Sequence, residues 1–392
     1  MARDRDIVLF GATGFTGSLT AAELVQRAPQ GAKTALAGRS REKLEQVRER
    51  LAEAVPCVAD AELVVVDAAD RAALRDVAAS TRVLASTAGP FVLHGREVVA
   101  ACAAEGTDYA DITGEPEFVD RTYLDCQDAA LASGARLVHC CGFDSIPHDL
   151  GAQFTVEQFP GDLPLHVRGY VRTEGGMFSG GTFNSALLAC GRARQMAQAA
   201  RRRVAAEKAA GAGDGRQVRN ETPRPHRALG YWAVPWPTID AAIVTRSARA
   251  LAEYGPRFTY GHYAAIRRLP TVIGGTAAVS GLMVAAQLPP LRRAIGDRVA
   301  PGTGPSVERM DRSTFSVRFV AEGGGRRVVT EVAGGDPGYR ETSRMLAESA
   351  LCLAFDDLPQ LAGQLTTAQA MGTVLRERLE RAGITFRVLD AT

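Results

Sequence analysis

The feature that most constrains the fold is a short apolar run that leads into a turn with evenly spaced glycines, close to the start of the sequence. The run Asp6–Phe10 has the pattern of a buried strand, Gly11, Gly14 and Gly17 follow it, and a helical pattern extends over about residues 18–26. In such a strand–turn–helix unit, glycines allow a sharp turn, close approach of a pyrophosphate and tight helix packing. The amides at the helix start then hold the phosphates. We interpret the turn as a variant dinucleotide fingerprint; the alternative is a tight turn that binds nothing.

The end of the second predicted strand indicates which dinucleotide is bound. The strand over residues 34–37 ends in Gly38-Arg39-Ser40. Sites for NAD usually have an acidic residue here, whereas a guanidinium pairs bidentately with the 2′-phosphate of NADP. Arg39 therefore predicts NADP, and Ser40 is expected to cap the next helix and to add a hydroxyl to the same phosphate. The alternative is that Arg39 and Arg41 are solvated surface charges.

Composition narrows the class of protein. The 392 residues are 46% hydrophobic and 23% charged, which is typical of a soluble chain with room for two domains. A formal net charge of +2 gives no basic field that would favour nucleic acid. The seven cysteines contain no C-x-x-C pair, which fits reduced thiols in a cytoplasmic protein. The charged N-terminus enters the first strand at once, and we expect no signal peptide.

Strands and helices alternate through the first third of the sequence. Further strands are expected at residues 62–66, 82–86, 108–111 and 136–140, and the first of these, with four apolar residues in a row at 63–66, predicts a strand buried inside a parallel sheet. The predicted fold class is α/β, an N-terminal Rossmann doubly wound parallel sheet with a second α+β domain. We expect three regions: an NADP-binding Rossmann domain over residues 1–145, a substrate and oligomerisation α+β domain over 146–345, and C-terminal helices over 346–392 that pack back on the Rossmann domain.

Beyond residue 151 the regular alternation of strands and helices ends. The pattern predicts a strand at 166–172, a helix at 181–207, a loop at 209–227, a hairpin from 314–321 and 326–333, helices at 339–355 and 368–381, and a last strand at 384–389.

Ligands of open α/β sheets bind at the carboxyl ends of the strands. Asp67 follows the third strand, where the adenine edge usually lies, and Gly89-Pro90 follow the fourth, near the expected nicotinamide ribose. The predicted cofactor-binding residues are Gly11, Ala12, Thr13, Gly14, Phe15, Thr16, Gly17, Gly38, Arg39, Ser40, Asp67, Gly89 and Pro90.

The predicted catalytic residues are Asp111, Glu115 and His148, which follow the next strands of the same edge. The alternative for each carboxylate is a helix cap or a turn former. Asp144-Ser145 before Ile146-Pro147 has the pattern of a helix start. No lysine lies four residues after a tyrosine, so the Tyr-x-x-x-Lys mechanism of short-chain dehydrogenases is excluded. No metal site is expected, because the six histidines form no close pair on a helix face.

Five ordered motifs carry a family resemblance. Residues Gly11–Gly17, Leu36-Ala-Gly-Arg39, Ser86-Thr-Ala-Gly-Pro90, Asp108–Glu115 and Cys141-Gly-Phe-Asp-Ser-Ile-Pro147 together resemble the saccharopine dehydrogenase-like family. More narrowly, the chain is similar to the trans-acting enoyl reductase branch. The resemblance includes the run Leu365–Gly372, which looks like the closing motif of the family with Thr367 where a proline is usual.

The resemblance implies an NADPH-dependent reductase of a double bond in a polyketide- or fatty-acyl chain, delivered by a partner polyketide synthase. Two alternatives stay open. One is a saccharopine-dehydrogenase-like oxidoreductase that reduces an imine linked to an amino acid. The other is a non-catalytic NADP-binding partner protein.

An uncharged run at residues 269–291 is long enough to span a bilayer. It is rich in small residues, has prolines near both ends and lies between parts of one apparent domain. Our first interpretation is a buried or dimer-forming helix, hence a homo-oligomer. The second is a helix that rests on a membrane or lines a lipid-chain tunnel, which would make the cytoplasmic protein membrane-associated. A transmembrane span is the third.

Overall fold

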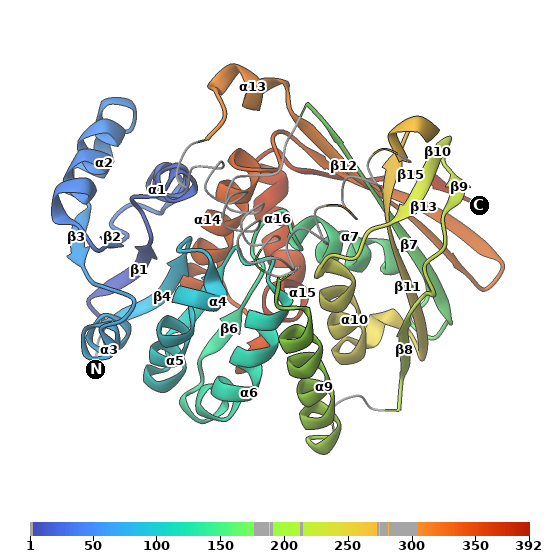
Figure 1. Ribbon diagram of the computed structural model, residues 1–392, viewed down its shortest axis with the longest axis horizontal. Helices are drawn as coiled ribbons and strands as arrows, with labels where there is room; N and C mark the ends of the chain where they lie inside the picture. Colours follow the sequence, from blue (N-terminus) through green and yellow to red (C-terminus); the bar gives the residue numbers. More distant parts are fainter. Residues whose placement is uncertain are drawn as a thin grey trace. The chain divides into compact units, whose positions relative to one another are not determined.

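The computed structural model describes residues 3–175, 188, 191–211, 215–272, 274, 281 and 304–392. The chain forms two compact units, each built around one sheet (Figure 1). Unit 1 comprises Met1–Phe143, Gly302–Gly304 and Gly338–Ala382, and unit 2 comprises Asp144–Pro301, Pro305–Pro337 and Gly383–Thr392.

The sheet of unit 1 has seven strands, all parallel, in the order β3-β2-β1-β4-β5-β6-β14. The strands are β1 (Arg5–Phe10), β2 (Thr34–Gly38), β3 (Glu62–Val65), β4 (Thr81–Ser86), β5 (Asp108–Asp111), β6 (Arg136–Val138) and β14 (Gly363–Leu365). The chain runs outward from β1 to β3, returns to β4 and continues to the other edge, which is the doubly wound order. The predicted fold class is confirmed.

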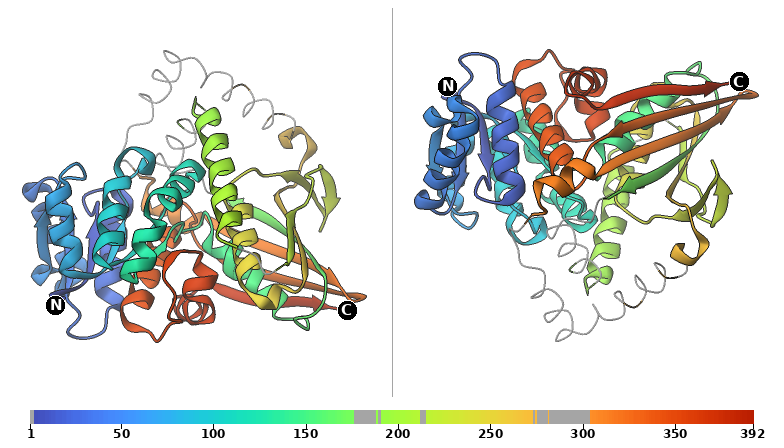
Figure 2. Two further views of the ribbon diagram at one scale, coloured as in Figure 1. Left: turned by 90° about the horizontal axis from the view of Figure 1, so that it is seen from below. Right: turned by 90° about the horizontal axis from the view of Figure 1, so that it is seen from above.

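Helices cover both faces of this sheet, because the crossovers change side where the strand order reverses. They are α1 (Phe15–Arg27), α2 (Arg41–Ala54), α3 (Arg71–Ala79), α4 (Phe91–His94), α5 (Arg96–Glu105), α6 (Pro116–Ser133), α14 (Arg340–Phe355), α15 (Thr367–Ala370) and α16 (Gly372–Arg381), with a 3₁₀ turn η1 (Pro56–Asp60). Neighbours pack in two rows, α3–α5–α6 and α1–α14–α16, and α1 lies beside α14 in Figure 2. Helix α5 ends at Gly106, whose positive φ of 69° is the left-handed conformation typical of a glycine after a helix.

Two details of unit 1 differ from the sequence-based expectation. The apolar strand β3 is not buried on both faces: it is an edge strand, and Val65 is 47% exposed, because the chain turns back after β3 and no strand lies outside it. Strand β14 was not expected at all, since three residues carry no readable alternation. In the closing motif, Thr366 caps α15 reciprocally with Gln369, and Thr367 is the first helical residue, a position that also suits proline.

Unit 2 contains a mixed sheet in the order β15-β13-β12-β7-β11-β10-β9, with β8 also paired to β11. Its strands are β7 (Leu165–Glu174), β8 (Gln217–Asn220), β9 (His226–Ala228), β10 (Tyr231–Pro235), β11 (Arg257–Ile266), β12 (Thr314–Gly323), β13 (Arg326–Gly334) and β15 (Thr385–Ala391). Its helices are α7 (Ile146–Val156), α9 (Ala193–Ala209), α10 (Asp240–Ala250) and α13 (Val307–Arg312), with a 3₁₀ turn η2 (Ala252–Tyr254). Helix α7 packs on β7, β12 and β13, and α10 packs on α7 and β11.

The hairpin of β12 and β13 and the last strand β15 are confirmed, and the three strands run side by side in Figure 2. The loop expected at residues 209–227 is wrong in part, because β8 and the start of β9 lie there and take their hydrogen bonds from β11 and β10. Residues Gly383–Thr392 belong to unit 2 through β15, whereas α14, α15 and α16 belong to unit 1. Most of the predicted apolar segment 269–291 lies outside the described residues. Within the described parts of the chain, no helix combines the length and the apolar character needed to cross a membrane.

Candidate functional site

The turn after β1, residues 11–17, is called the fingerprint turn below. Gly11 has a φ of +86°, and its amide donates to the carbonyl of Ala37 on the neighbouring strand. A Cβ at Gly17 would lie 2.2 Å from the Gly11 carbonyl oxygen, so this glycine is required for the turn itself. A Cβ at Gly14 would meet only that oxygen, at 3.5 Å, which is ordinary contact. The two glycines therefore have separate tasks: Gly17 closes the turn, and Gly14 keeps its outer side open.

The start of α1 has the features of an anion-binding helix N-terminus. Gly14 occupies the N-cap position without a side-chain cap, and the first turn of the helix contains no acidic residue. The first amides of a helix are unsatisfied donors at the positive end of its dipole, which suits phosphate. Thr13 and Gly14 are also exposed. These observations fit the diphosphate of a dinucleotide.

The tip of β2 carries the residues expected to select the cofactor. Arg39 is exposed and makes no ion pair with any residue in the described ranges. Ser40 caps α2 by accepting from the Lys43 amide at 3.3 Å, as the sequence predicts. Arg41 pairs with Glu45 one turn on, at 3.6 Å. Arg39 is thus the guanidinium available for a 2′-phosphate.

The remaining predicted cofactor residues follow β3 and β4. Asp67 is exposed and accepts from the Ala69 amide at 2.9 Å. Gly89 donates to the Thr87 carbonyl, and Pro90 is the N-cap of α4. All thirteen predicted residues lie in unit 1, at the ends of four adjacent parallel strands.

Sequence analysis missed the contribution of α14 to the fingerprint turn. Tyr339, just before this helix, packs edge-on against Phe15 with ring centroids 4.9 Å apart, and Ser343 donates to the Thr16 carbonyl at 3.2 Å. More than 320 residues separate these partners in sequence, so no local pattern could have indicated them.

Asp111 is the last residue of β5 and Glu115 is the N-cap of α6, both in unit 1, and both carboxylates accept backbone hydrogen bonds. Asp111 accepts from the amides of Thr113 and Cys140 and contacts His139 Nδ1 at 2.7 Å. Cys140 has a positive φ of 63°, a conformation that this bond helps to hold. Glu115 is nearly buried and accepts from Phe91 and Val92 at the start of α4, at 2.9 and 2.8 Å. Both carboxylates therefore hold loops that follow strands of the cofactor edge.

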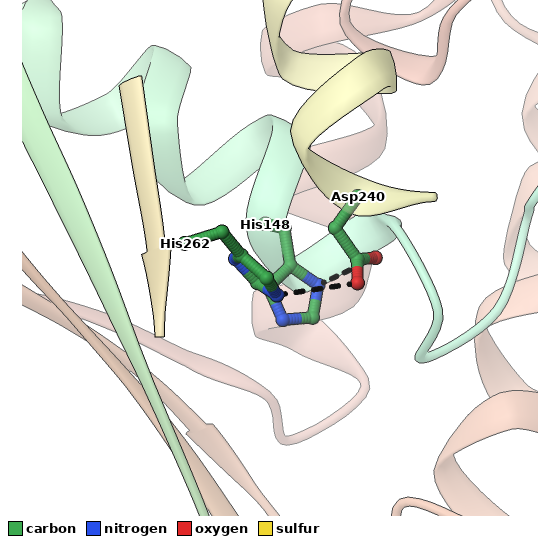
Figure 3. A group of neighbouring side chains, drawn as sticks. All are labelled: His148, Asp240 and His262. Carbon is green, nitrogen blue, oxygen red and sulfur yellow. Dashed lines mark ion pairs between the residues drawn. The ribbon is translucent and has the colours of Figure 1, made fainter. Parts of the chain in front are cut away.

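His148, the third predicted catalytic residue, lies in unit 2, on α7. Its side chain points toward Asp240 at the start of α10 and His262 on β11, as Figure 3 shows. The closest atoms are His148 Nδ1 to Asp240 Oδ1 at 3.3 Å and His262 Nε2 to Asp240 Oδ2 at 3.4 Å. We call these three residues the histidine–aspartate cluster. All three are buried, with 2–7% exposure.

The sequence did not predict the cluster, because its members lie far apart in the chain: Asp240 follows His148 by 92 residues, and His262 follows Asp240 by 22. Burial raises the pKa of Asp240, but the nearby His148 and His262 and the hydrogen bond from Thr238 outweigh it, so the net shift is downward. Nearby, burial and the charge of Asp240 raise the pKa of Asp144 to about 7. Ser145 occupies the predicted N-cap position of α7, yet its hydroxyl donates to the Asp144 carbonyl and to Asp240 rather than capping the helix.

The doubly wound sheet, the open fingerprint turn and the exposed Arg39 define a dinucleotide-binding protein of the Rossmann class. Residues 7–138 match the sequence model described as the saccharopine dehydrogenase NADP binding domain. NADP is therefore the cofactor, as Arg39 predicts.

Proteins of similar length match nearly the whole chain. It is 35% identical over 416 residues to a trans-acting enoyl reductase of Mycobacterium tuberculosis, covering 97% of each chain. It is 34% identical over 425 residues to a trans-acting enoyl reductase of Mycobacterium ulcerans, covering 100% of this chain and 98% of the relative. The chain belongs to the saccharopine dehydrogenase-like family, in its trans-acting enoyl reductase branch, which confirms the resemblance. The fold also matches apo saccharopine dehydrogenase from Saccharomyces cerevisiae, with a TM-score of 0.57, 13% identity, and 99% and 100% coverage.

Proposed function

We propose that the protein is an NADPH-dependent enoyl reductase that acts in trans on an acyl chain carried by a partner polyketide synthase, in the synthesis of a lipid. The observation that carries this proposal is the identity of about 35% to proteins named trans-acting enoyl reductases over nearly the full length of both chains. The match includes unit 2 as well as the NADP-binding residues. This favours a shared substrate class rather than a shared cofactor domain alone.

The amides of the fingerprint turn would hold the diphosphate of NADPH, and Arg39 would hold its 2′-phosphate; the chemistry that the cofactor would supply is a hydride for the β-carbon of the enoyl group. The α-carbon must then receive a proton, for which the proposed donors are Asp111, Glu115, His148 or an ordered water. Glu115 also fixes the loop at Pro90 through the Phe91 and Val92 amides, so its loss should disturb the expected nicotinamide side of the site.

The direct test is NADPH oxidation with a panel of trans-2-enoyl thioesters of increasing chain length, each compared with its saturated thioester. We expect turnover with enoyl substrates only, and faster turnover when the acyl chain is presented on a carrier protein. Turnover instead with a 2-oxo acid and an amine would favour the imine-reductase alternative. NADPH binding without turnover on either panel would favour the non-catalytic alternative.

The proton donor is tested with Asp111→Ala, Glu115→Ala and His148→Ala. Loss of a general acid typically lowers turnover by about 10²–10⁴-fold. The true donor should show this loss with unchanged NADPH affinity, whereas a positioning role of Glu115 should weaken both. If all three variants keep near-normal turnover, the donor is water or another group.

Homo-oligomerisation and peripheral membrane contact stay predictions.

A further inference from the structure

Of the histidine–aspartate cluster, only His148 is a candidate for a role in the proposed reaction, and Asp240 and His262 have none. Two imidazoles face a single carboxylate, and the candidate ligand atoms of all three residues lie within 4.8 Å of one another. In Figure 3 the three side chains converge from α7, α10 and β11. His262 Nε2 is buried and forms no hydrogen bond of good geometry within the described ranges; it faces Asp240 Oδ2 instead.

The spacing suits a divalent cation. Ligand atoms about 2.0–2.1 Å from a tetrahedral Zn²⁺ lie roughly 3.3–3.4 Å from each other. In the cluster, His148 Nδ1 lies 3.3 Å from Oδ1 of Asp240 and His262 Nε2 lies 3.4 Å from Oδ2, so each imidazole has this spacing to a different oxygen of the same carboxylate. Two imidazoles and one carboxylate are also a donor set that first-row ions such as Zn²⁺ accept, whereas Mg²⁺ and Ca²⁺ prefer oxygen ligands.

Neighbouring groups support this donor set from outside. The Tyr260 hydroxyl lies 3.3 Å from His262 Nδ1, so it can accept the Nδ1 proton and leave the Nε2 lone pair facing the centre of the cluster. Thr238 donates to Asp240 Oδ2, and the Ser145 hydroxyl lies 3.4 Å from Oδ1. Such outer contacts orient ligands in metal sites.

The local charge is compatible with a cation. Asp240 and Asp149 lie in the first turns of α10 and α7 and offset the positive ends of these helices.

We propose that His148, Asp240 and His262 bind one divalent cation of the Zn²⁺ type within unit 2. Three protein ligands leave at least one coordination position for water or for an oxygen of a bound molecule. The ion would join α7, α10 and β11 at one point. Under this assignment His148 is a ligand and not the proton donor.

The test uses the full-length protein, stripped with a chelator and dialysed. Titration with Co²⁺, followed by its visible absorption, reports binding, and displacement by Zn²⁺ and bound-metal analysis give the stoichiometry. The variants are His148→Gln, Asp240→Asn and His262→Gln, with Tyr260→Phe as an outer-contact variant. The control is His166→Gln, which removes a histidine of unit 2 that pairs with Glu221 at 3.0 Å, outside the cluster. Fluorescence of Trp232 and Trp236, both in unit 2, checks that this unit stays folded.

We expect one equivalent of Co²⁺ in the parent protein and in His166→Gln, displaced by Zn²⁺ but not by Mg²⁺. Tyr260→Phe should weaken binding by about tenfold, and each ligand variant by more than that. Failure of the folded parent to bind one equivalent would overturn the proposal. Unchanged affinity in folded ligand variants would also overturn it, because the ion would then lie elsewhere, for example on a cysteine. None of these readouts depends on reductase activity.

Discussion

The candidate sites of the two units consist of different groups, mostly backbone in unit 1 and buried side chains in unit 2. In unit 1 the proposed cofactor site consists mostly of backbone, namely a turn with glycines and a helix start, together with one exposed guanidinium, all within a few residues of four strand ends. In unit 2 the histidine–aspartate cluster is made of buried side chains from three separate elements. A site made of local backbone leaves a pattern in the sequence, and one made of distant side chains does not. The predictions below test this contrast from the largest expected effect to the smallest.

Gly14→Val should abolish NADPH binding while the protein stays folded. The added side chain would fill the open outer side of the fingerprint turn, where the diphosphate is expected, yet its Cβ has room in the fold. Binding is measured by fluorescence titration with NADPH, and folding by circular dichroism. The contrasting variant is Gly17→Ala, whose Cβ would meet the Gly11 carbonyl oxygen at 2.2 Å and should destabilise unit 1 itself. Tight NADPH binding by folded Gly14→Val would show that the turn has no phosphate-binding role.

Asp240→Ala should destabilise unit 2 by about 3–5 kcal/mol, because it removes the carboxylate that two buried imidazoles and Thr238 share. Urea denaturation in the presence of a chelator, followed by tryptophan fluorescence, reports this unit, since Trp232 and Trp236 both lie in it. His166→Ala, at a partly exposed ion pair, is the control, with an expected effect below about 1 kcal/mol. Equal effects of the two variants would show that the cluster is no better organised than a surface pair.

Arg39→Ala should weaken NADPH binding by about ten- to a hundredfold, or roughly 1.5–3 kcal/mol, and leave NADH binding nearly unchanged. Titration of both cofactors measures this difference. Arg41→Ala is the matched control, because Arg41 already pairs with Glu45 on its own helix. A variant that retains the full preference for NADPH would rule out Arg39 as the selecting residue.

Ser40→Ala should cost about 1 kcal/mol of unit 1 stability through loss of the α2 cap. Denaturation followed by far-ultraviolet circular dichroism detects the loss. Ser40→Thr should retain most of the stability, since threonine also caps. If Ser40→Ala changes NADPH affinity and leaves stability unaltered, the hydroxyl serves the phosphate rather than the helix.

The contrast between the units also explains what the sequence could predict. Gly11, Gly14, Arg39 and Ser40 are local signals, and the elements around them were located correctly. The burial of β3 was misjudged because an apolar strand looks the same at the edge and in the centre of a sheet. Residues 231–266, which hold β10, α10 and β11, were not assigned, and His262 and Asp240 lie among them. Their convergence on His148 depends on the pairing of β11 with β7, which only the folded chain defines.

The packing of α14 has a consequence for how this protein can be divided. This helix contacts β1, β4 and β5, although nearly 200 residues of unit 2 separate it from Phe143 in the chain. A fragment that stops at Phe143 would expose the apolar face that α14 covers and should aggregate. The Phe143 amide, however, donates to the Thr342 hydroxyl at 3.2 Å, so the two ends of the interruption meet. Residues 144–337, which hold most of unit 2, are therefore arranged like an insertion in a parent nucleotide-binding domain, whereas the last strand of unit 2, β15, follows α16. A short linker in place of residues 144–337, in a chain that ends at Ala382 so that β15 is not left without its sheet, should preserve that parent where truncation at Phe143 destroys it.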